Sequence, residues 1–131
     1  MDKIAEMLTR IRNAQLAGHG EVTIKPSKFK FALAEILKKE GYLEEVSREK
    51  DSNDIKIVLK YFKDSNTQKV PAIKGIKKIS KLGQRNYIRS KDIRKVKNNY
   101  GTAILSTSKG IMTGEESKKI GLGGEYICEV W

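Results

Sequence analysis

Apolar residues recur at helical spacing in two segments near the start of the chain. The first segment begins after Asp2 and ends at Gly18, and the second begins after Ser27 and ends at Gly41. Aspartate and serine cap the free N–H groups of a helix start, and glycine adopts the left-handed conformation that ends a helix. The apolar positions of the two stripes are Ile4, Met7, Leu8, Ile11, Ala14, Phe29, Leu33, Ile36 and Leu37. This spacing predicts two helices, each with one buried face.

Apolar and polar residues alternate in "DIKIVLKY", residues 54–61. A period of two is typical of a strand with one buried face. The preceding segment "YLEEVSRE", residues 42–49, is its predicted hairpin partner, with the turn at residues 51–53. A further short strand, "EVTIK" at residues 21–25, is predicted between the two helices. The first half of the chain therefore predicts the order helix, strand, helix, strand, strand.

The pattern changes in "KDSNTQK", residues 63–69, which is polar, has no periodicity and predicts a linker. The rest of the chain predicts mainly strands. Their residues are 72–80, 85–91, 102–108 and 124–131. One short helix is predicted between the last two strands, because Thr113 and Glu116 have the spacing of a capping box and Gly121 can end the helix.

These elements predict an α+β fold of two small lobes that pack together. The N-terminal α/β lobe is expected at residues 1–64, and a mainly β C-terminal lobe with one short helix at residues 65–131. Packing is expected because about 65 residues are near the lower limit for independent folding. No apolar run is long enough to span a bilayer, and the first residues form an amphipathic pattern instead of a signal sequence. We expect a cytoplasmic protein that does not enter a membrane.

The positive charge of the chain is unevenly distributed. The whole chain carries 27 basic and 16 acidic residues, for a formal net charge of +11. Residues 1–66 hold 13 basic and 11 acidic residues, whereas residues 67–131 hold 14 basic and 5 acidic ones. Most of the excess lies between Lys69 and Lys97, where Asp92 is the only acid. The second half is therefore expected to bind a polyanion.

Few residues could support catalysis or hold a metal ion. The single histidine, His19, lies between two glycines, and its surroundings predict a loop or helix-ending role. The single cysteine, Cys128, is predicted to be a buried, inert thiol on the same strand face as Tyr126 and Val130. Neither residue has the partners of a catalytic triad or a zinc site. We expect a protein that is not an enzyme and has no cofactor or metal.

The glycine-rich "GLGG", residues 121–124, superficially resembles a phosphate-binding loop. It lacks the lysine and hydroxyl residue that such loops use. Gly121 therefore predicts a helix end, while Gly123 and Gly124 leave room for a ligand backbone to approach.

The stretch "QRNYIRSKDIRKVK" has the composition of a nucleic-acid contact. If Ile88 points into the core of a strand, Arg85, Tyr87, Arg89 and Lys91 share the opposite face. Guanidinium groups bind phosphate oxygens, and a tyrosine ring can lie against a base or sugar. The alternative is an ordinary solvated face. Because few acids balance these cations, nucleic acid is the favoured partner.

The stretch "STSKG", residues 106–110, follows the apolar run at residues 103–105. Serine and threonine hydroxyls donate and accept hydrogen bonds, which suits base edges and 2′-hydroxyls of RNA, and Lys109 can meet phosphate. The alternative is a strand end whose hydroxyls bind its own backbone.

Several segments together resemble the S-eight family of bacterial small-subunit ribosomal proteins, over essentially the whole chain. The segments are "DKIAEMLTRIRNA", "PSKFKFALAEILKKEGYLEE", "LKYF" and "LSTSKGIMTGEESKKIGLGGEYICEVW". The resemblance implies a primary binder of ribosomal RNA that acts in the central domain of the small-subunit RNA during assembly. This chain differs from the family at Lys3 and Leu82, where other members commonly have proline. The change at residue 82 is expected to loosen the turn before Arg85.

The resemblance also implies which residues touch RNA, most of them in the C-terminal lobe. The expected contacts there are Ser106, Thr107, Ser108, Lys109, Gly110, Gly123, Gly124, Glu125, Arg85, Tyr87 and Arg89. Lys30 and Lys56 are candidates for weaker backbone contacts from the N-terminal lobe. Glu125 could accept hydrogen bonds from base amino groups or 2′-hydroxyls, or it could hold the loop through backbone N–H groups. The sequence leaves both roles open.

The expected partners are small-subunit ribosomal RNA, neighbouring ribosomal proteins and, by mimicry of the ribosomal site, the messenger RNA of the protein's own operon. The free protein is expected to be a monomer. The main alternative is an interaction module that docks protein partners through its apolar last strand and Trp131. The charge asymmetry of the chain argues against this alternative.

Overall fold

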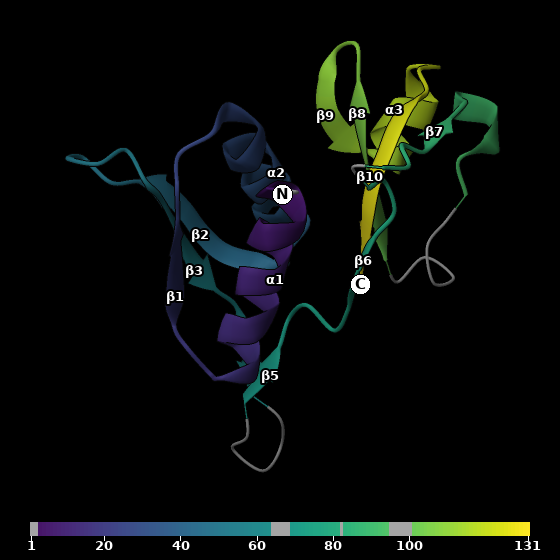
Figure 1. The fold of residues 1–131 in the computed structure, drawn as a ribbon. Helices are drawn as coiled ribbons and strands as arrows, with labels where there is room; N and C mark the ends of the chain where they lie inside the picture. Colours follow the sequence, from purple (N-terminus) through teal and green to yellow (C-terminus); the bar gives the residue numbers. More distant parts are fainter. Residues whose placement is uncertain (1–2, 64–68, 82, 95–100) are drawn as a thin grey trace. The chain divides into compact units, whose positions relative to one another are not determined.

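The computed structural model describes residues 3–63, 69–81, 83–94 and 101–131, and these form two compact units that divide between Ile73 and Lys74 (Figure 1). The division lies beyond residue 64, because β4 (Tyr61–Lys63) and β5 (Lys69–Pro71) pair as an antiparallel two-stranded sheet. Lys63 and Lys69, the two ends of the predicted linker at residues 63–69, are therefore paired strand residues. The predicted cap Asp2, residues 64–68, Leu82 and Lys97 lie outside the described residues.

The N-terminal unit has the predicted order of elements. It contains α1 (Lys3–Leu16), β1 (Glu21–Ile24), α2 (Lys28–Lys39), β2 (Leu43–Arg48) and β3 (Ile55–Leu59). The strands form an antiparallel sheet in the order β1-β3-β2, with both helices on one side of it (Figure 1). The core is made by apolar residues of the helices and of β3, which lies in the middle of the sheet. Its most deeply buried members include Met7, Ile11, Leu33, Leu37, Ile55 and Ile57.

The predicted helix ends of this unit are confirmed where the structure describes them. The hydroxyl of Ser27 accepts a hydrogen bond from the backbone N–H of Lys30 at 3.4 Å. Gly18 and Gly41 have φ angles of +72° and +89°, the left-handed conformation that glycine adopts without steric cost. After Gly18, the N–H of His19 donates to the carbonyl of Ala14 at 2.9 Å. The predicted helix-ending role of His19 is thereby confirmed.

The C-terminal unit is mainly β, as predicted. It contains β6 (Ile76–Lys78), β7 (Tyr87–Ile88), the 3-10 helix η1 (Ser90–Asp92), β8 (Thr102–Thr107), β9 (Gly110–Thr113), α3 (Gly114–Lys119) and β10 (Gly124–Val130). Strand β10 pairs with β8 along one edge, while β6 and β7 share its other edge. Helix α3 begins at the predicted cap, where the Thr113 hydroxyl accepts from the N–H of Glu116 at 3.2 Å. The mixed α+β class is confirmed, with the expected short helix.

Strand β9 was missed by the sequence interpretation. Ser106 and Thr107 belong to β8, and Thr107 lies opposite Gly110, the first residue of β9. The "STSKG" stretch is therefore the end of a β-hairpin, with a turn at residues 108–109. The signal was available, because a glycine after a two-residue turn, followed by apolar residues, is typical of a hairpin.

The basic strand predicted at residues 85–91 is much shorter than expected. Only Tyr87 and Ile88 pair with β10, and Arg89 already precedes the 3-10 turn, where the Asp92 N–H donates to its carbonyl at 2.9 Å. The ladder ends there because β10 itself begins opposite Ile88. Arg85, Tyr87, Arg89 and Lys91 are therefore not one row on a single strand, although Ile88 packs against the core as predicted.

The buried thiol and the strand face that it shares with Val130 were predicted correctly, but the face shared with Tyr126 was not. Cys128 is 0% exposed, and so is Val130. A bulge in the pairing with β8 lies between Tyr126 and Cys128, and Ile127 and Cys128 are both buried. The bulge interrupts the alternation on which the shared face with Tyr126 rested.

Because Cys128 is buried, we predict that its thiol reacts slowly with thiol reagents. Loss of hydration raises its pKa from 9.0 to about 12, so the thiolate fraction at pH 8 falls roughly a thousandfold relative to an ordinary cysteine. We expect a coloured thiol reagent to label the native protein far more slowly than the protein unfolded in denaturant. Equal labelling rates in the two states would contradict the burial of this side chain.

Candidate nucleic-acid interface

Three of the predicted contact residues lie side by side on neighbouring strands of the C-terminal unit. Glu125 of β10 is directly opposite Ser106 of β8 on one side and Tyr87 of β7 on the other. Directly opposite residues of an antiparallel pair point to the same face of the sheet. The register therefore makes a row of a hydroxyl, a carboxylate and a phenol ring.

The carboxylate in the middle of this row is held by the protein itself. Its Oε2 accepts hydrogen bonds from the Ser80 hydroxyl at 2.5 Å and from Nη1 of Arg85 at 3.1 Å. The Glu125 side chain is 20% exposed, and its other oxygen, Oε1, accepts no hydrogen bond within the described part of the chain. Glu125 thus has one fixed oxygen and one that can accept a bond from a ligand.

Ser80, which the sequence interpretation missed, is the centre of this arrangement. It is 0% exposed, and its hydroxyl also accepts from the backbone N–H of Asn86 at 3.2 Å. The Asn86 side chain donates to the carbonyl of Ile79 at 2.8 Å, and the Asn86 carbonyl accepts from the N–H of Tyr126 at 2.8 Å. The segment before Tyr87 is fixed in this way. No local motif marks Ser80, since Glu125 is 45 residues away in sequence.

The hydroxyls of the β8–β9 hairpin divide into two kinds. Thr107 uses its hydroxyl within the turn, because its Oγ1 donates to the carbonyl of Gly110 at 2.8 Å and accepts from the N–H of Lys109 at 3.1 Å. Ser106 and Ser108 make no hydrogen bond through their side chains to other described residues. The alternative in which the hydroxyls bind the backbone of their own strand end therefore holds, among these three residues, only for Thr107.

Gly123 and Gly124 serve the protein's own packing, and the expectation that they leave room for a ligand backbone is corrected. A Cβ atom at Gly123 would lie 2.3 Å from the carbonyl oxygen of Ile88, and one at Gly124 would lie 2.3 Å from that of Ser106. These distances are far inside van der Waals contact. The space beside each glycine is filled by the backbone of a neighbouring strand.

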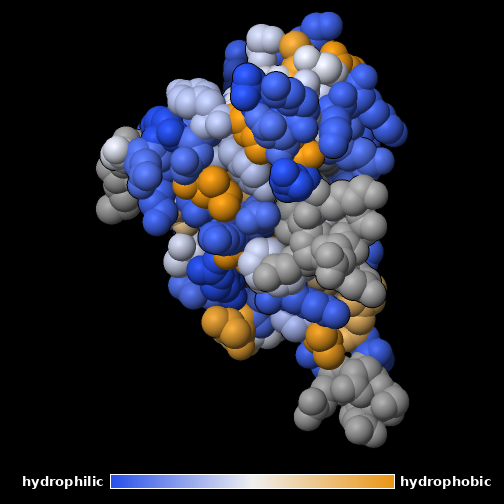
Figure 2. Space-filling model, turned by 90° about the vertical axis from the view of Figure 1, so that its right-hand side faces the viewer, coloured by the Kyte–Doolittle hydropathy of each residue, from blue (hydrophilic) through white to orange (hydrophobic). Residues whose placement is uncertain are grey.

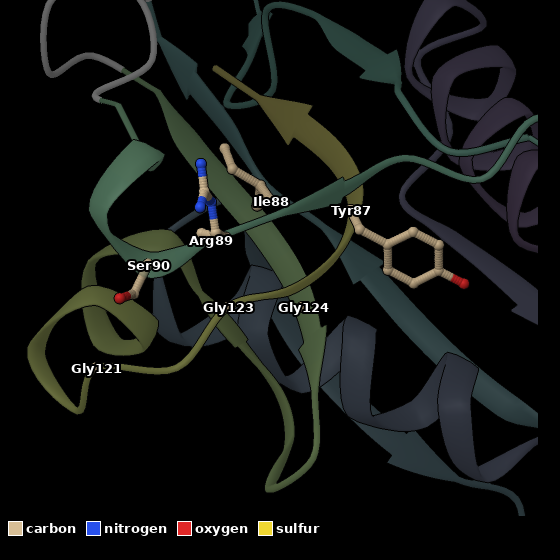
Figure 3. Close-up of a pocket in the computed structure, with 7 residues that line it drawn as sticks. All are labelled: Tyr87, Ile88, Arg89, Ser90, Gly121, Gly123 and Gly124. Carbon is tan, nitrogen blue, oxygen red and sulfur yellow. The ribbon is translucent and has the colours of Figure 1, made fainter.

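A hollow of about 440 Å³ borders this region (Figure 3). Its lining residues are Tyr87, Ile88, Arg89, Ser90, Gly121, Gly123 and Gly124. Figure 3 shows the Tyr87 ring directed away from Arg89 and Ser90. Tyr87 is 74% exposed, so its ring is available to an incoming base, and the exposed Arg89 pairs only loosely with Asp92 at 3.4 Å.

The two lysines predicted from the N-terminal lobe are less available than expected. Lys30 is only 8% exposed, and Lys56 forms an ion pair with Glu21 at 3.4 Å. A phosphate contact by either residue would have to displace its present arrangement.

The described residues lack two features that would indicate other function classes. No helix there is long and apolar enough to cross a membrane. Among these residues, no group of three or more histidine, cysteine, aspartate or glutamate side chains could hold a metal ion.

Comparisons with known proteins agree with the resemblance found in the sequence. The model of the family "Ribosomal protein S8" matches residues 2–131. The chain is 51% identical over 130 residues to the "Small ribosomal subunit protein uS8" of Nitratidesulfovibrio vulgaris, covering 99% of this chain and 98% of the relative. It is 47% identical over 132 residues to the protein of the same name from Clostridium acetobutylicum, covering 99% and 97%. The chain therefore belongs to the ribosomal protein S8 family, whose members are structural and not enzymatic proteins.

Proposed function

We propose that this protein binds folded ribosomal RNA directly, in the central domain of the small-subunit RNA, and helps that domain assemble. As a ribosomal protein of the small subunit it acts in the cytoplasmic ribosome. Its binding surface is the row formed by Ser106, Glu125 and Tyr87 together with the β8–β9 turn. Recognition needs no chemical step, because every group in this surface binds without reacting.

The main support for this proposal is the free hydrogen-bonding capacity of side chains on an otherwise well-bonded sheet. The hydroxyls of Ser106 and Ser108 and the Oε1 atom of Glu125 have no bonding partner in the described chain. A carboxylate repels phosphate, so Glu125 selects donors such as base amino groups or 2′-hydroxyls. Hydroxyls accept and donate, which suits the mixed edges of an RNA minor groove.

The cations and the aromatic ring complete the proposed contact. The exposed side chains of Lys109 and Arg89 meet phosphates and supply salt-dependent attraction. The exposed ring of Tyr87 stacks on an unpaired base or packs on a sugar. Gly110, Gly123 and Gly124 act indirectly, since they allow the turn and the close approach of the strands.

The same surface would bind any RNA that reproduces the shape of the ribosomal site. We therefore also propose that the messenger RNA of the protein's own operon competes with ribosomal RNA for this surface and that its translation is repressed. Competition between the two transcripts for one protein tests this step. Simultaneous binding of both transcripts would rule it out.

Docking of a protein partner through Trp131 is the less favoured function. The Trp131 ring packs against the cluster of Ile93, Ala103 and Leu105, and a Cβ atom at Gly75 would lie 2.4 Å from that ring. The backbone of Trp131 is bonded to Gly75 in both directions at 3.0 Å. Trp131 thus already has a structural role. Neighbouring ribosomal proteins would touch other parts of a protein that is a monomer when free.

The proposal predicts different effects for two neighbouring hydroxyls. Ser108→Ala should weaken binding to a central-domain RNA fragment about three- to tenfold, the effect of one hydrogen bond, and leave the salt slope unchanged. Thr107→Val should instead lower the melting temperature, because its hydroxyl bonds within the turn. The measurement is RNA affinity across a salt series, together with thermal unfolding.

An unrelated duplex of the same length is the control RNA. Wild-type protein should prefer the central-domain fragment at high salt, where attraction to phosphate is weak. Equal binding to both RNAs that fades together with rising salt would show that the surface only attracts polyanions, and specific recognition would then be wrong.

A further inference from the structure

Apolar and charged side chains outside the C-terminal surface meet on the β4–β5 ribbon of the N-terminal unit. Phe62 is 55% exposed and Val70 is 37% exposed, and the two lie directly opposite each other. The surface view shows separate apolar patches on a largely hydrophilic face (Figure 2). A two-stranded ribbon with an exposed aromatic residue is only marginally stable by itself. A partner that covers Phe62 would stabilise it.

The charges of the ribbon indicate the chemistry of this partner. Lys63 and Lys69 are both exposed and lie directly opposite each other on the face of the ribbon that does not carry Phe62, and like charges at such positions repel. The ammonium group of Lys69 lies 5.5 Å from the centre of the Tyr61 ring. The ammonium group of Lys60 lies 5.5 Å from the centre of the Phe62 ring. None of these three lysines has a carboxylate partner among the residues that the structure describes. An anion would therefore relieve a repulsion that no carboxylate of the described residues offsets.

We infer that the β4–β5 ribbon is a second RNA-binding site, in which an unpaired nucleotide stacks on Phe62 beside Lys60. The RNA backbone then passes over the edge of the ribbon, so that the next phosphates meet Lys63 and Lys69 on its opposite face. Stacking on an aromatic ring and attraction of phosphate by neighbouring lysines are the two features of single-stranded RNA sites. A protein partner fits less well, because two exposed apolar side chains are far less than the roughly 800 Å² that each partner contributes to a stable interface. This inference rests on the proposed binding of ribosomal RNA.

The ring itself, and not merely its apolar surface, is required by this inference. Phe62→Leu keeps an apolar side chain but removes the face on which a base stacks, whereas Phe62→Trp enlarges that face. We expect Phe62→Leu to weaken binding to a full-length small-subunit RNA transcript about tenfold and Phe62→Trp to leave it within about twofold. An apolar contact with a protein would tolerate leucine.

Leu16 provides the matched control, since it is an 80% exposed apolar residue of the same unit. Leu16→Ala should leave the affinity for the transcript unchanged. Lys63→Gln should reduce the slope of log affinity against log salt by about 0.7, the value for one phosphate contact on a single strand. Thermal unfolding of each variant checks that the protein stays folded.

The outcomes separate this inference from the proposed function. If Ser108→Ala weakens binding while Phe62→Leu and Lys63→Gln behave as wild type, the ribbon site is wrong and the C-terminal surface stands. If the wild-type protein binds the transcript no more tightly than an unrelated duplex, the proposed function is wrong, and the ribbon site that rests on it is wrong as well. A photoreactive benzoyl-phenylalanine at residue 62 should cross-link to ribosomal RNA in assembled small subunits, and a cross-link to protein alone would overturn the inference.

Discussion

Gly124→Ala should destabilise the C-terminal unit by about 1–3 kcal/mol and weaken RNA binding at least about tenfold. The added methyl group would lie 2.3 Å from the carbonyl oxygen of Ser106 and 3.1 Å from the Cα atom of Thr107. Both atoms belong to the backbone, so no side-chain rotation can relieve the contact. Strand β8 must move away from β10, and Ser106 then leaves its place beside Glu125.

Gly83→Ala is the matched control for this substitution. It adds the same methyl group in the same unit, but apart from Gly83 itself and its two chain neighbours no atom lies within 4 Å of the new position. Its melting temperature and RNA affinity should stay close to those of the wild type. Both properties are measured by thermal unfolding and by binding to the central-domain fragment below the melting temperature of each variant. Wild-type behaviour of Gly124→Ala would show that the two strands are not packed as closely as the structure has them.

Ser80→Ala should cost about 2–3 kcal/mol of stability and about fivefold in RNA affinity, although its side chain is fully buried and touches no RNA in the proposed mode. The substitution removes the hydrogen bond that Ser80 donates to the Glu125 carboxylate, which is stronger than a neutral bond because the acceptor is charged. It also leaves the Asn86 N–H without its acceptor. Glu125 is then held by Arg85 alone.

Ser117→Ala is the control, because Ser117 is an equally buried serine of the same unit whose hydroxyl donates to the carbonyl of Leu122. It should cost about 1 kcal/mol, the value of one neutral hydrogen bond, and should not change the RNA affinity of the folded protein. A purely structural role of Ser80 predicts that both variants lose affinity only as they unfold.

A double-mutant cycle distinguishes positioning of Glu125 from a general loss of stability. If Ser80 acts through the carboxylate, the effects of Ser80→Ala and Glu125→Gln on RNA affinity should be far from additive. Additive effects would mean that the two residues influence binding independently, and the positioning role of Ser80 would be wrong.

The local structure of the N-terminal unit was predictable from its sequence. Helical and strand periods place apolar residues such as Leu33 and Ile57 on buried faces, and Ser27 and Gly41 mark helix ends through hydrogen bonding and backbone geometry that depend on few neighbours. The charge asymmetry of the chain and the burial of Cys128 could also be predicted from the sequence. Each of these features follows from residues close together in the chain.

The proposed interface could be predicted from the sequence only as a set of residues. The sequence identified Ser106, Ser108, Tyr87 and Glu125 as candidate RNA contacts. It could not show that the Thr107 hydroxyl forms hydrogen bonds within the turn. Nor could it show that the predicted basic strand ends after Ile88. Both outcomes depend on how the hairpin and β10 pair, and a period of two does not determine which residues of two strands lie opposite each other.

Sequence alone thus determined the classes of the elements, the caps of the helices, the more basic half of the chain and the kinds of side chain that face RNA in the proposed function. Tertiary structure alone decided that Ser80, Arg85 and Glu125 meet at one carboxylate and that Gly123 and Gly124 must lack side chains. The physical reason is that capping, charge and periodicity act over a few residues, whereas strand register brings together groups far apart in the chain.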